Sequence, residues 1–75
     1  MIERKIALTT INDVKNFVNT VTRCDFNIDL SSGRYRVDGK SIMGIFSLDL
    51  SKPITLVAYT DDLTFEENIK PFVIE

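Results

Sequence analysis

Residues 37–52 read "VDGKSIMGIFSLDLSK", and they predict a short helix that carries apolar side chains on too many sides. Ser41 is placed to be its N-cap, because a serine hydroxyl accepts a hydrogen bond from a backbone N–H of the first helical turn. At about 100° per residue the apolar side chains fall on two neighbouring arcs. One arc holds Ile42, Met43 and Phe46, and the other holds Ile45 and Leu48.

A short helix on a sheet buries only one stripe of its surface, so one arc is expected to face the core and the other to face outward. If Ile45 and Leu48 point inward, the other arc forms an exposed apolar patch beside Ser41. Exposed apolar clusters that include a flexible methionine are typical of protein-binding surfaces. The alternative is that the C-terminal tail or a loop covers the helix, and periodicity alone leaves both interpretations open.

The segments around this stretch predict an alternation of strands and helices. Residues 25–30 alternate strictly between polar and apolar side chains, which indicates a half-buried strand. Residues 11–23 carry apolar side chains at helical spacing, and Thr10 with Asp13 forms a capping-box pattern at the start. The predicted order is strand 2–8, helix 11–23, strand 25–30, strand 35–37, the short helix after Ser41, strand 53–60 and helix 61–70.

This order favours an α+β fold in which a four-stranded antiparallel sheet carries its helices on one face. Residues 1–75 form a single domain, with no internal repeat and no linker. Pro71 is expected to end the last helix at Lys70. The apolar tail "FVIE" at 72–75 is expected to pack back on the body.

The amino-acid composition narrows the classes of function that we expect. Apolar residues make up 44% and charged residues 27% of the chain, as in globular proteins, and the net charge is −2 with both signs interspersed. No basic stripe is present, so we expect no nucleic-acid binding. The first ten residues lack the apolar run of a signal peptide, and no stretch is long enough to cross a bilayer, so we expect a cytoplasmic location and no membrane contact.

The chain contains no histidine and one cysteine. A histidine metal ligand, a Ser-His or Cys-His pair and an imidazole phosphoryl acceptor are therefore excluded. One cysteine makes neither an internal disulfide nor a zinc site. We predict no catalytic residues, no metal and no cofactor. Asp61, Asp62, Glu66 and Glu67 resemble a metal cluster only superficially, because acidic residues at a helix start are explained by the helix dipole.

Ser41 also has a functional interpretation. A phosphate on this serine would meet free N–H groups at the helix start, with Lys40 next to it, and would place roughly −1.5 to −2 charges on the rim of the apolar patch. Such a change would work as a binding switch. A serine at this position is more often simply a helix cap, and physical reasoning alone favours that role.

The segment "KSIMGIFSLDLSK" resembles the signature around the regulatory serine of HPr, the small phosphocarrier of the bacterial sugar phosphotransferase system. The family pattern runs approximately Lys-Ser-Ile-Met-Gly-Val-Met-Ser-Leu-Gly, and Asp49 stands here in place of the final glycine. The resemblance extends over about residues 2–65 without a gap in "DFNIDL", the turn and "YRVDGKS". It implies the HPr open-faced β-sandwich, with the order βαββαβα.

The chain departs from the family at the phosphocarrier site. In HPr the phosphoryl group is carried by a histidine in a loop such as Gly-Leu-His-Ala-Arg-Pro, ahead of the first helix. The corresponding loop here is "ALTTINDVK", which has no His, Arg, Pro or Gly and is several residues shorter. Thr9 and Thr10 are nearest in position, but a phosphothreonine ester is a poor phosphoryl donor. The last helix is also short relative to the family.

A catabolite-repression paralogue of HPr also lacks the histidine and keeps the serine, so the resemblance implies a regulatory role rather than an enzyme. It makes Ser41 the phosphorylation site of an HPr kinase/phosphorylase and a LacI-type transcription factor or another regulatory protein the partner. The partner-binding residues would then be Lys40, Ile42, Met43 and Phe46.

Three further interpretations stay open. The protein could take part in phosphoryl transfer through Thr9, Thr10 or Cys24, or it could be an HPr-fold binding protein with no phosphorylation site in use. The exposed patch could also make a homodimer. Cys24 is expected to be a small buried side chain after the first helix rather than a reactive thiol.

Overall fold

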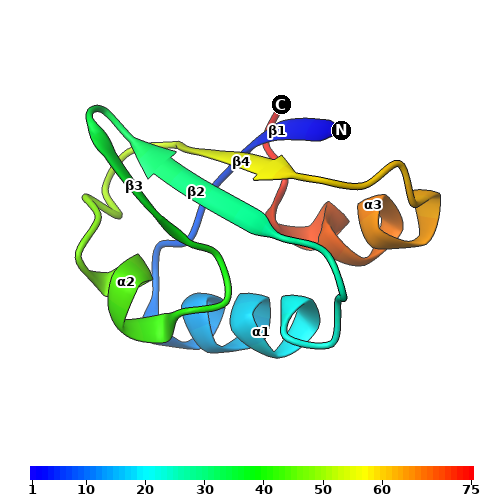
Figure 1. Cartoon of the computed structure of the whole chain (residues 1–75). Coiled ribbons are helices and arrows are strands. Elements are labelled where there is room, and N and C mark those ends of the chain that lie inside the picture. The colour runs from blue at the N-terminus through cyan, green and yellow to red at the C-terminus, as the bar shows by residue number, and fades with distance from the viewer.

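Four strands form one antiparallel sheet in the order β1-β4-β2-β3, in a computed structural model that describes residues 1–75. Figure 1 shows the sheet with its three helices. In chain order the elements are β1 (Ile2–Ile6), α1 (Ile11–Val21), β2 (Ile28–Ser32), β3 (Tyr35–Asp38), α2 (Ile42–Phe46), β4 (Ile54–Ala58), α3 (Leu63–Ile69) and a 3₁₀ helix at Lys70–Phe72.

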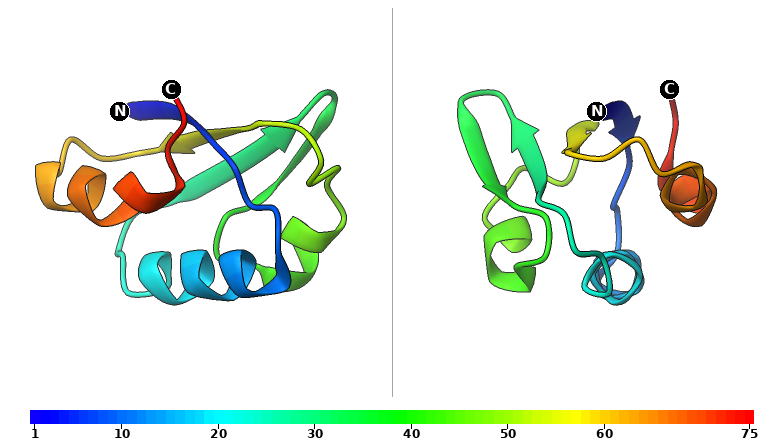
Figure 2. Two further views of the ribbon diagram at one scale, coloured as in Figure 1. Left: turned by 180° about the vertical axis from the view of Figure 1, so that it is seen from behind. Right: turned by 45° about the vertical axis from the view of Figure 1, so that its right-hand side comes forward.

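All three helices cover the same face of the sheet, and the other face is open (Figures 1 and 2). The fold class predicted from the sequence is therefore confirmed, including the βαββαβα order. Alternation along β4 explains the two faces, because Ile54, Leu56 and Ala58 are buried under the helices and Thr55 and Val57 lie on the open side.

One cluster of buried apolar side chains joins the sheet to the helices. Its largest fully buried side chain is Phe17 of α1. Burial of large apolar side chains supplies most of the folding free energy of such a small domain. The cluster consists of Ile2, Ile6, Leu8, Val14, Phe17, Val21, Ile28, Leu30, Ile45, Leu48, Ile54, Leu56, Ala58, Phe65 and Ile69.

Helix α1 begins where its capping box predicts. The Thr10 side chain accepts a hydrogen bond from the Asp13 N–H, and the Asp13 carboxylate accepts one from the Thr10 N–H. The helix ends at Val21, two residues before the predicted end at Arg23. Val21 is the last side chain that reaches the core, and the Cys24 N–H bonds to the Val21 carbonyl to turn the chain.

Strand β2 differs most from its prediction. It covers Ile28–Ser32 rather than 25–30, because its neighbours β4 and β3 end opposite Ile28 and Asp29 and leave residues 25–27 without a ladder. The hairpin turn shrinks to Gly33 and Arg34, so the strand runs on to Ser32. Gly33 has a φ of +60°, as favoured at the first central position of a two-residue type II′ turn.

β1, β4 and α3 are shorter than predicted, whereas β3 (Tyr35–Asp38) extends one residue beyond the predicted 35–37. β1 stops at Ile6, although Leu8 is buried as expected. β4 covers Ile54–Ala58, within the predicted 53–60. Helix α3 begins at Leu63 because Asp62 is its N-cap, and it ends before Pro71 as predicted.

The C-terminal tail packs back on the body, as predicted, and covers the outer edge of β1. The Ala7 N–H donates to the Phe72 carbonyl and the Ile74 N–H donates to the Lys5 carbonyl, each at 2.9 Å. The Phe72 ring packs edge-to-face on Phe17 with 5.4 Å between ring centroids. No helix of the structure has both the length and the hydropathy needed to cross a membrane.

Candidate functional site

Ser41 is the N-cap of α2. Its backbone is extended, and its Oγ accepts a hydrogen bond from the Gly44 N–H at 3.1 Å. The side chain is half-buried. The absence of a side chain at Gly44 leaves room for this hydrogen bond. A Cβ at that position would crowd the Ser41 Oγ at a distance of 3.3 Å. The predicted capping role is therefore confirmed.

One apolar arc of α2 faces the core and the other faces solvent, as expected if Ile45 and Leu48 point inward. Ile45 is fully buried and Leu48 is 6% exposed, so this arc faces the sheet. Met43 is 78% exposed and Phe46 is 41% exposed, and neither the tail nor a loop covers them. Ile42 is half-buried and packs against the core, so it belongs to the exposed surface only in part.

A further exposed apolar side chain, Ile11, lies at the start of α1. It is 62% exposed, because it is the first residue of α1 and the stripe that reaches the core starts at Val14. The start of α1 lies beside α2 in both views of the ribbon (Figures 1 and 2). We call Ile42, Met43 and Phe46 the apolar patch.

Lys40 makes a contact that the sequence did not suggest. Its ammonium group donates to the Cys24 carbonyl at 2.6 Å, and its backbone N–H donates to the Asp38 carboxylate at 2.9 Å. The side chain therefore ties the loop before α2 to the end of α1. A lysine near a helix C-terminus is also favoured by the helix dipole.

Thr9 and Thr10 lie at the start of α1, where the phosphocarrier histidine of the resembled family would be expected. Both are exposed, and both are bound to Asp13. Its carboxylate accepts hydrogen bonds from the Thr9 hydroxyl at 3.0 Å and from the N–H groups of both threonines. The bonds from Thr9 are the main reason why the pKa of Asp13 lies below its ordinary value. A phosphate on either threonine would meet this carboxylate and be repelled.

Cys24 lies at the other end of α1, so it does not share a site with Thr9 or Thr10. An 11-residue helix is about 16 Å long. Burial raises the pKa of the Cys24 thiol, nearby Asp62 and Asp25 raise it further, and Lys40 opposes them. A thiol with a raised pKa carries little thiolate near neutral pH, and the thiolate is the nucleophilic form.

No three side chains among Cys, Asp and Glu gather closely enough to hold a metal ion. The acidic side chains near α3 have local partners instead. Asp62 caps the helix by accepting from the Thr64 N–H, and the Glu66 carboxylate pairs with the Arg4 guanidinium. Asp61 pairs with the N-terminal ammonium group at 2.6 Å.

A scan against protein-family models found no match, and a search of curated proteins found none either. One solved structure that the chain resembles is the crystal structure of HPr-C-His from Thermoanaerobacter tengcongensis. The TM-score is 0.80 at 25% sequence identity, and the match covers 97% of this chain and 91% of that chain. The protein therefore has an HPr-like fold.

Proposed function

We propose that this protein is an HPr-like regulatory module that binds another protein through the apolar patch and is switched by phosphorylation of Ser41. The observation that carries the proposal is the position of Ser41, which caps α2 directly ahead of Met43 and Phe46. The HPr-like fold supports the same interpretation, and the segment "KSIMGIFSL" of this chain includes α2.

The phosphocarrier reaction of the resembled family is not proposed for this chain. That reaction needs a histidine, and the sequence has none. The phosphoryl group on an imidazole nitrogen transfers readily to the next acceptor, whereas a phosphate ester of threonine does not. The protein is accordingly proposed to be a regulator of the bacterial sugar phosphotransferase system in the cytoplasm, and not an enzyme.

Phosphorylation would change the charge at the edge of the apolar patch. The new group would bring roughly −1.5 to −2 charges to a side chain whose Oγ now bonds only to the Gly44 N–H. Lys40 is held nearby by the Cys24 carbonyl, and the Asp38 carboxylate lies on the same loop. The partner would therefore recognise apolar contacts and a dianion together, which suits a surface with exposed Arg or Lys beside an apolar pocket.

The resemblance names the proteins to test. An HPr kinase/phosphorylase would modify Ser41, and a LacI-type transcription factor or another regulator of catabolite repression would bind the modified form. Ile42, Met43 and Phe46 would supply partner contacts. Lys40 would contribute only if its bond to Cys24 opens on binding, because its ammonium group is engaged in the free protein.

The test is the intact mass after incubation with ATP and HPr kinase of the same host. Ser41→Ala and Ser41→Asn are the controls. Asparagine keeps the capping acceptor and cannot be phosphorylated, so it separates loss of the site from loss of the cap. One added phosphate on the wild type and none on Ser41→Asn is the expected result.

A phosphate that persists in Ser41→Asn would overturn the proposal. Peptide mapping would then locate it, and a phosphate at Thr9, Thr10 or Cys24 would support a role in phosphoryl transfer. No phosphate on any variant, with the patch still able to bind a regulator, would indicate an HPr-fold binding protein without a switch.

A further inference from the structure

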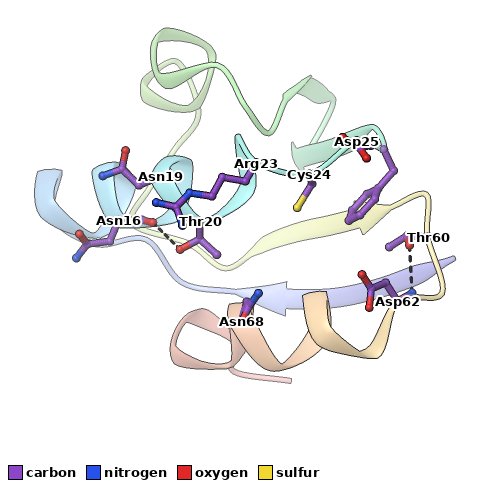
Figure 3. Close-up of a pocket in the computed structure, with 10 residues that line it drawn as sticks. Asn16, Asn19, Thr20, Arg23, Cys24, Asp25, Thr60, Asp62 and Asn68 are labelled. Carbon is purple, nitrogen blue, oxygen red and sulfur yellow. Dashed lines mark hydrogen bonds between the residues drawn. The ribbon is translucent and has the colours of Figure 1, made fainter.

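A polar hollow lies between the C-terminal half of α1 and helix α3, and the proposed switch does not use it (Figure 3). Its volume is about 780 Å³, which is large enough for a small organic molecule. Three segments of the chain line it: α1, the loop between α1 and β2, and the region from the end of β4 into α3.

Four polar side chains at this hollow have no partner within the chain. The amides of Asn16, Asn19 and Asn68 make no side-chain hydrogen bond, and the Arg23 guanidinium forms no ion pair. The first two asparagines lie on α1 and Asn68 lies on α3, so asparagines from two helices line one hollow (Figure 3). Three of the five asparagines of the chain gather here.

The exposed side of α1 toward the hollow is built from residues that do not favour a helix. Asn16, Asn19 and Thr20 follow the spacing i, i+3 and i+4, which places them on one stripe of α1. Asparagine and threonine have lower helix propensity than lysine or glutamate, which usually fill such positions. Residues that lower helix stability and make no compensating contact within the fold are typical of a functional surface.

The chemistry of the lining selects the ligand. A carboxamide both donates and accepts hydrogen bonds, as a hydroxyl group does, so adjacent amides match a molecule that carries several hydroxyl groups. The half-buried Phe26 supplies an apolar wall, and its ring is fixed edge-to-face against Phe65 with 5.1 Å between centroids. The C–H face of a sugar ring packs well on such a surface.

The charges at the hollow disfavour an anionic ligand. Arg23 brings one positive charge, and the carboxylates of Asp25 and Asp62 bring two negative charges. An anion would be repelled by these carboxylates. A metal ion would lack ligands, since no three acidic or thiol groups gather at one point. A neutral molecule would form hydrogen bonds with the free amides, and it would neither be repelled by the carboxylates nor need metal ligands.

We propose that the hollow between α1 and α3, which is lined by Asn16, Asn19, Asn68, Arg23 and Phe26, binds a small neutral polyhydroxylated molecule such as a hexose or a sugar alcohol. The hollow is open and its amides are exposed, so the affinity is expected to be in the millimolar range, about 1–10 mM. The proposal stands independently of phosphorylation at Ser41.

The test is an NMR titration of the ¹⁵N-labelled full chain with D-glucose, D-galactose and D-mannitol, each in turn, and with glucose 6-phosphate. Saturable shifts of the side-chain NH₂ signals of Asn16, Asn19 and Asn68 are expected with at least one neutral compound. The phosphate ester should bind more weakly than its parent sugar, because of Asp25 and Asp62.

Matched variants separate the site from a general solvent effect. Asn19→Ala and Asn68→Ala should each weaken binding about fivefold, as expected for one lost hydrogen bond. Asn12→Ala is the control, because Asn12 also lies on α1 but does not line the hollow.

The proposal is overturned if no neutral compound gives a saturable shift, or if binding is unchanged in both asparagine variants. Tighter binding of the phosphate ester would instead identify Arg23 as the centre of an anion site and contradict a neutral ligand.

Discussion

Asp13 determines how the start of α1 responds to acid. Its carboxylate accepts three hydrogen bonds from Thr9 and Thr10, so its pKa is lower in the folded protein than the ordinary value of 3.8. A lowered pKa means that this carboxylate stabilises the fold fully above the unfolded value, and that the contribution is lost as pH falls through the folded value.

Asp13→Asn should therefore lower stability near neutral pH, while wild type and variant become equally stable once the carboxylate is protonated. Urea unfolding at about pH 6 and about pH 2.5 measures the difference. A difference that stays constant across this range would show that the charge of Asp13 plays no part.

Gly39 is a second residue whose role is local and steric. A Cβ at this position would lie 2.7 Å from the Ile28 Cγ2 and 3.1 Å from the Ile28 carbonyl oxygen, and both atoms belong to the buried start of β2. Gly39→Ala should destabilise the protein by about 1–3 kcal/mol, the usual cost of overpacking.

The matched control for this variant is Arg34→Ala. Arg34 is an exposed residue of the hairpin turn between β2 and β3. This change should cost less than about 1 kcal/mol. If both variants unfold at the same urea concentration, the close approach of Gly39 to Ile28 does not matter for stability.

At the scale of the elements, the buried side of α2 stabilises the fold, and we propose that its exposed side binds a partner. Ile45→Ala removes a fully buried side chain and should cost about 2–5 kcal/mol of unfolding free energy. Met43→Ala changes a side chain that is 78% exposed and should shift stability by no more than about 0.5 kcal/mol.

We expect the Met43→Ala change to affect binding of a partner more than it affects stability. Met43→Ala should weaken binding of a regulatory protein to the apolar patch, with its fold unchanged by circular dichroism, because exposed methionine is typical of binding surfaces. Calorimetric titration of wild type and Met43→Ala checks this. Loss of stability in Met43→Ala would mean that α2 is purely structural.

The elements also show what the sequence could and could not predict. The start of α1 and the cap of α2 were predicted correctly, because Thr10, Asp13 and Ser41 carry their capping chemistry in their own side chains. The bounds of β2 were wrong because a strand ends where its neighbours end, and alternation along "DFNIDL" contains no information about β3 and β4. The exposed arc of α2 was one of two open alternatives, and only packing against the sheet decided between them.

Contacts between distant segments were the least predictable part of the candidate site. The bond from Lys40 to the Cys24 carbonyl joins residues 16 positions apart, and nothing in either segment indicates it. The hollow between α1 and α3 was also missed, because Asn16 and Asn68 become neighbours only after the sheet is formed. The capping chemistry of the site is therefore local, whereas its surroundings depend on the fold.

At the scale of the whole molecule, the C-terminal tail completes the fold from outside the sheet. β1 is an edge strand, and an edge strand leaves unpaired backbone groups. Residues 72–75 cover part of this edge, with hydrogen bonds that join Lys5 to Ile74 and to Glu75 and Ala7 to Phe72. A domain of 75 residues has a small core, so a tail that adds both apolar burial and backbone pairing contributes a large share of its stability.

Two variants test the tail, and they separate its two contributions. Phe72→Ala keeps the backbone bonds and removes the ring from Phe17, so it should cost about 2–3 kcal/mol, less than for a fully buried ring because Phe72 is half-buried. Deletion of residues 72–75 removes ring and bonds together and should cost more. In hydrogen exchange, the amides of Lys5 and Ala7 should lose protection on deletion and keep part of it in Phe72→Ala. Equal stability of the deletion and the wild type would mean that β1 is held by β4 alone, and the small core would then be sufficient without its tail.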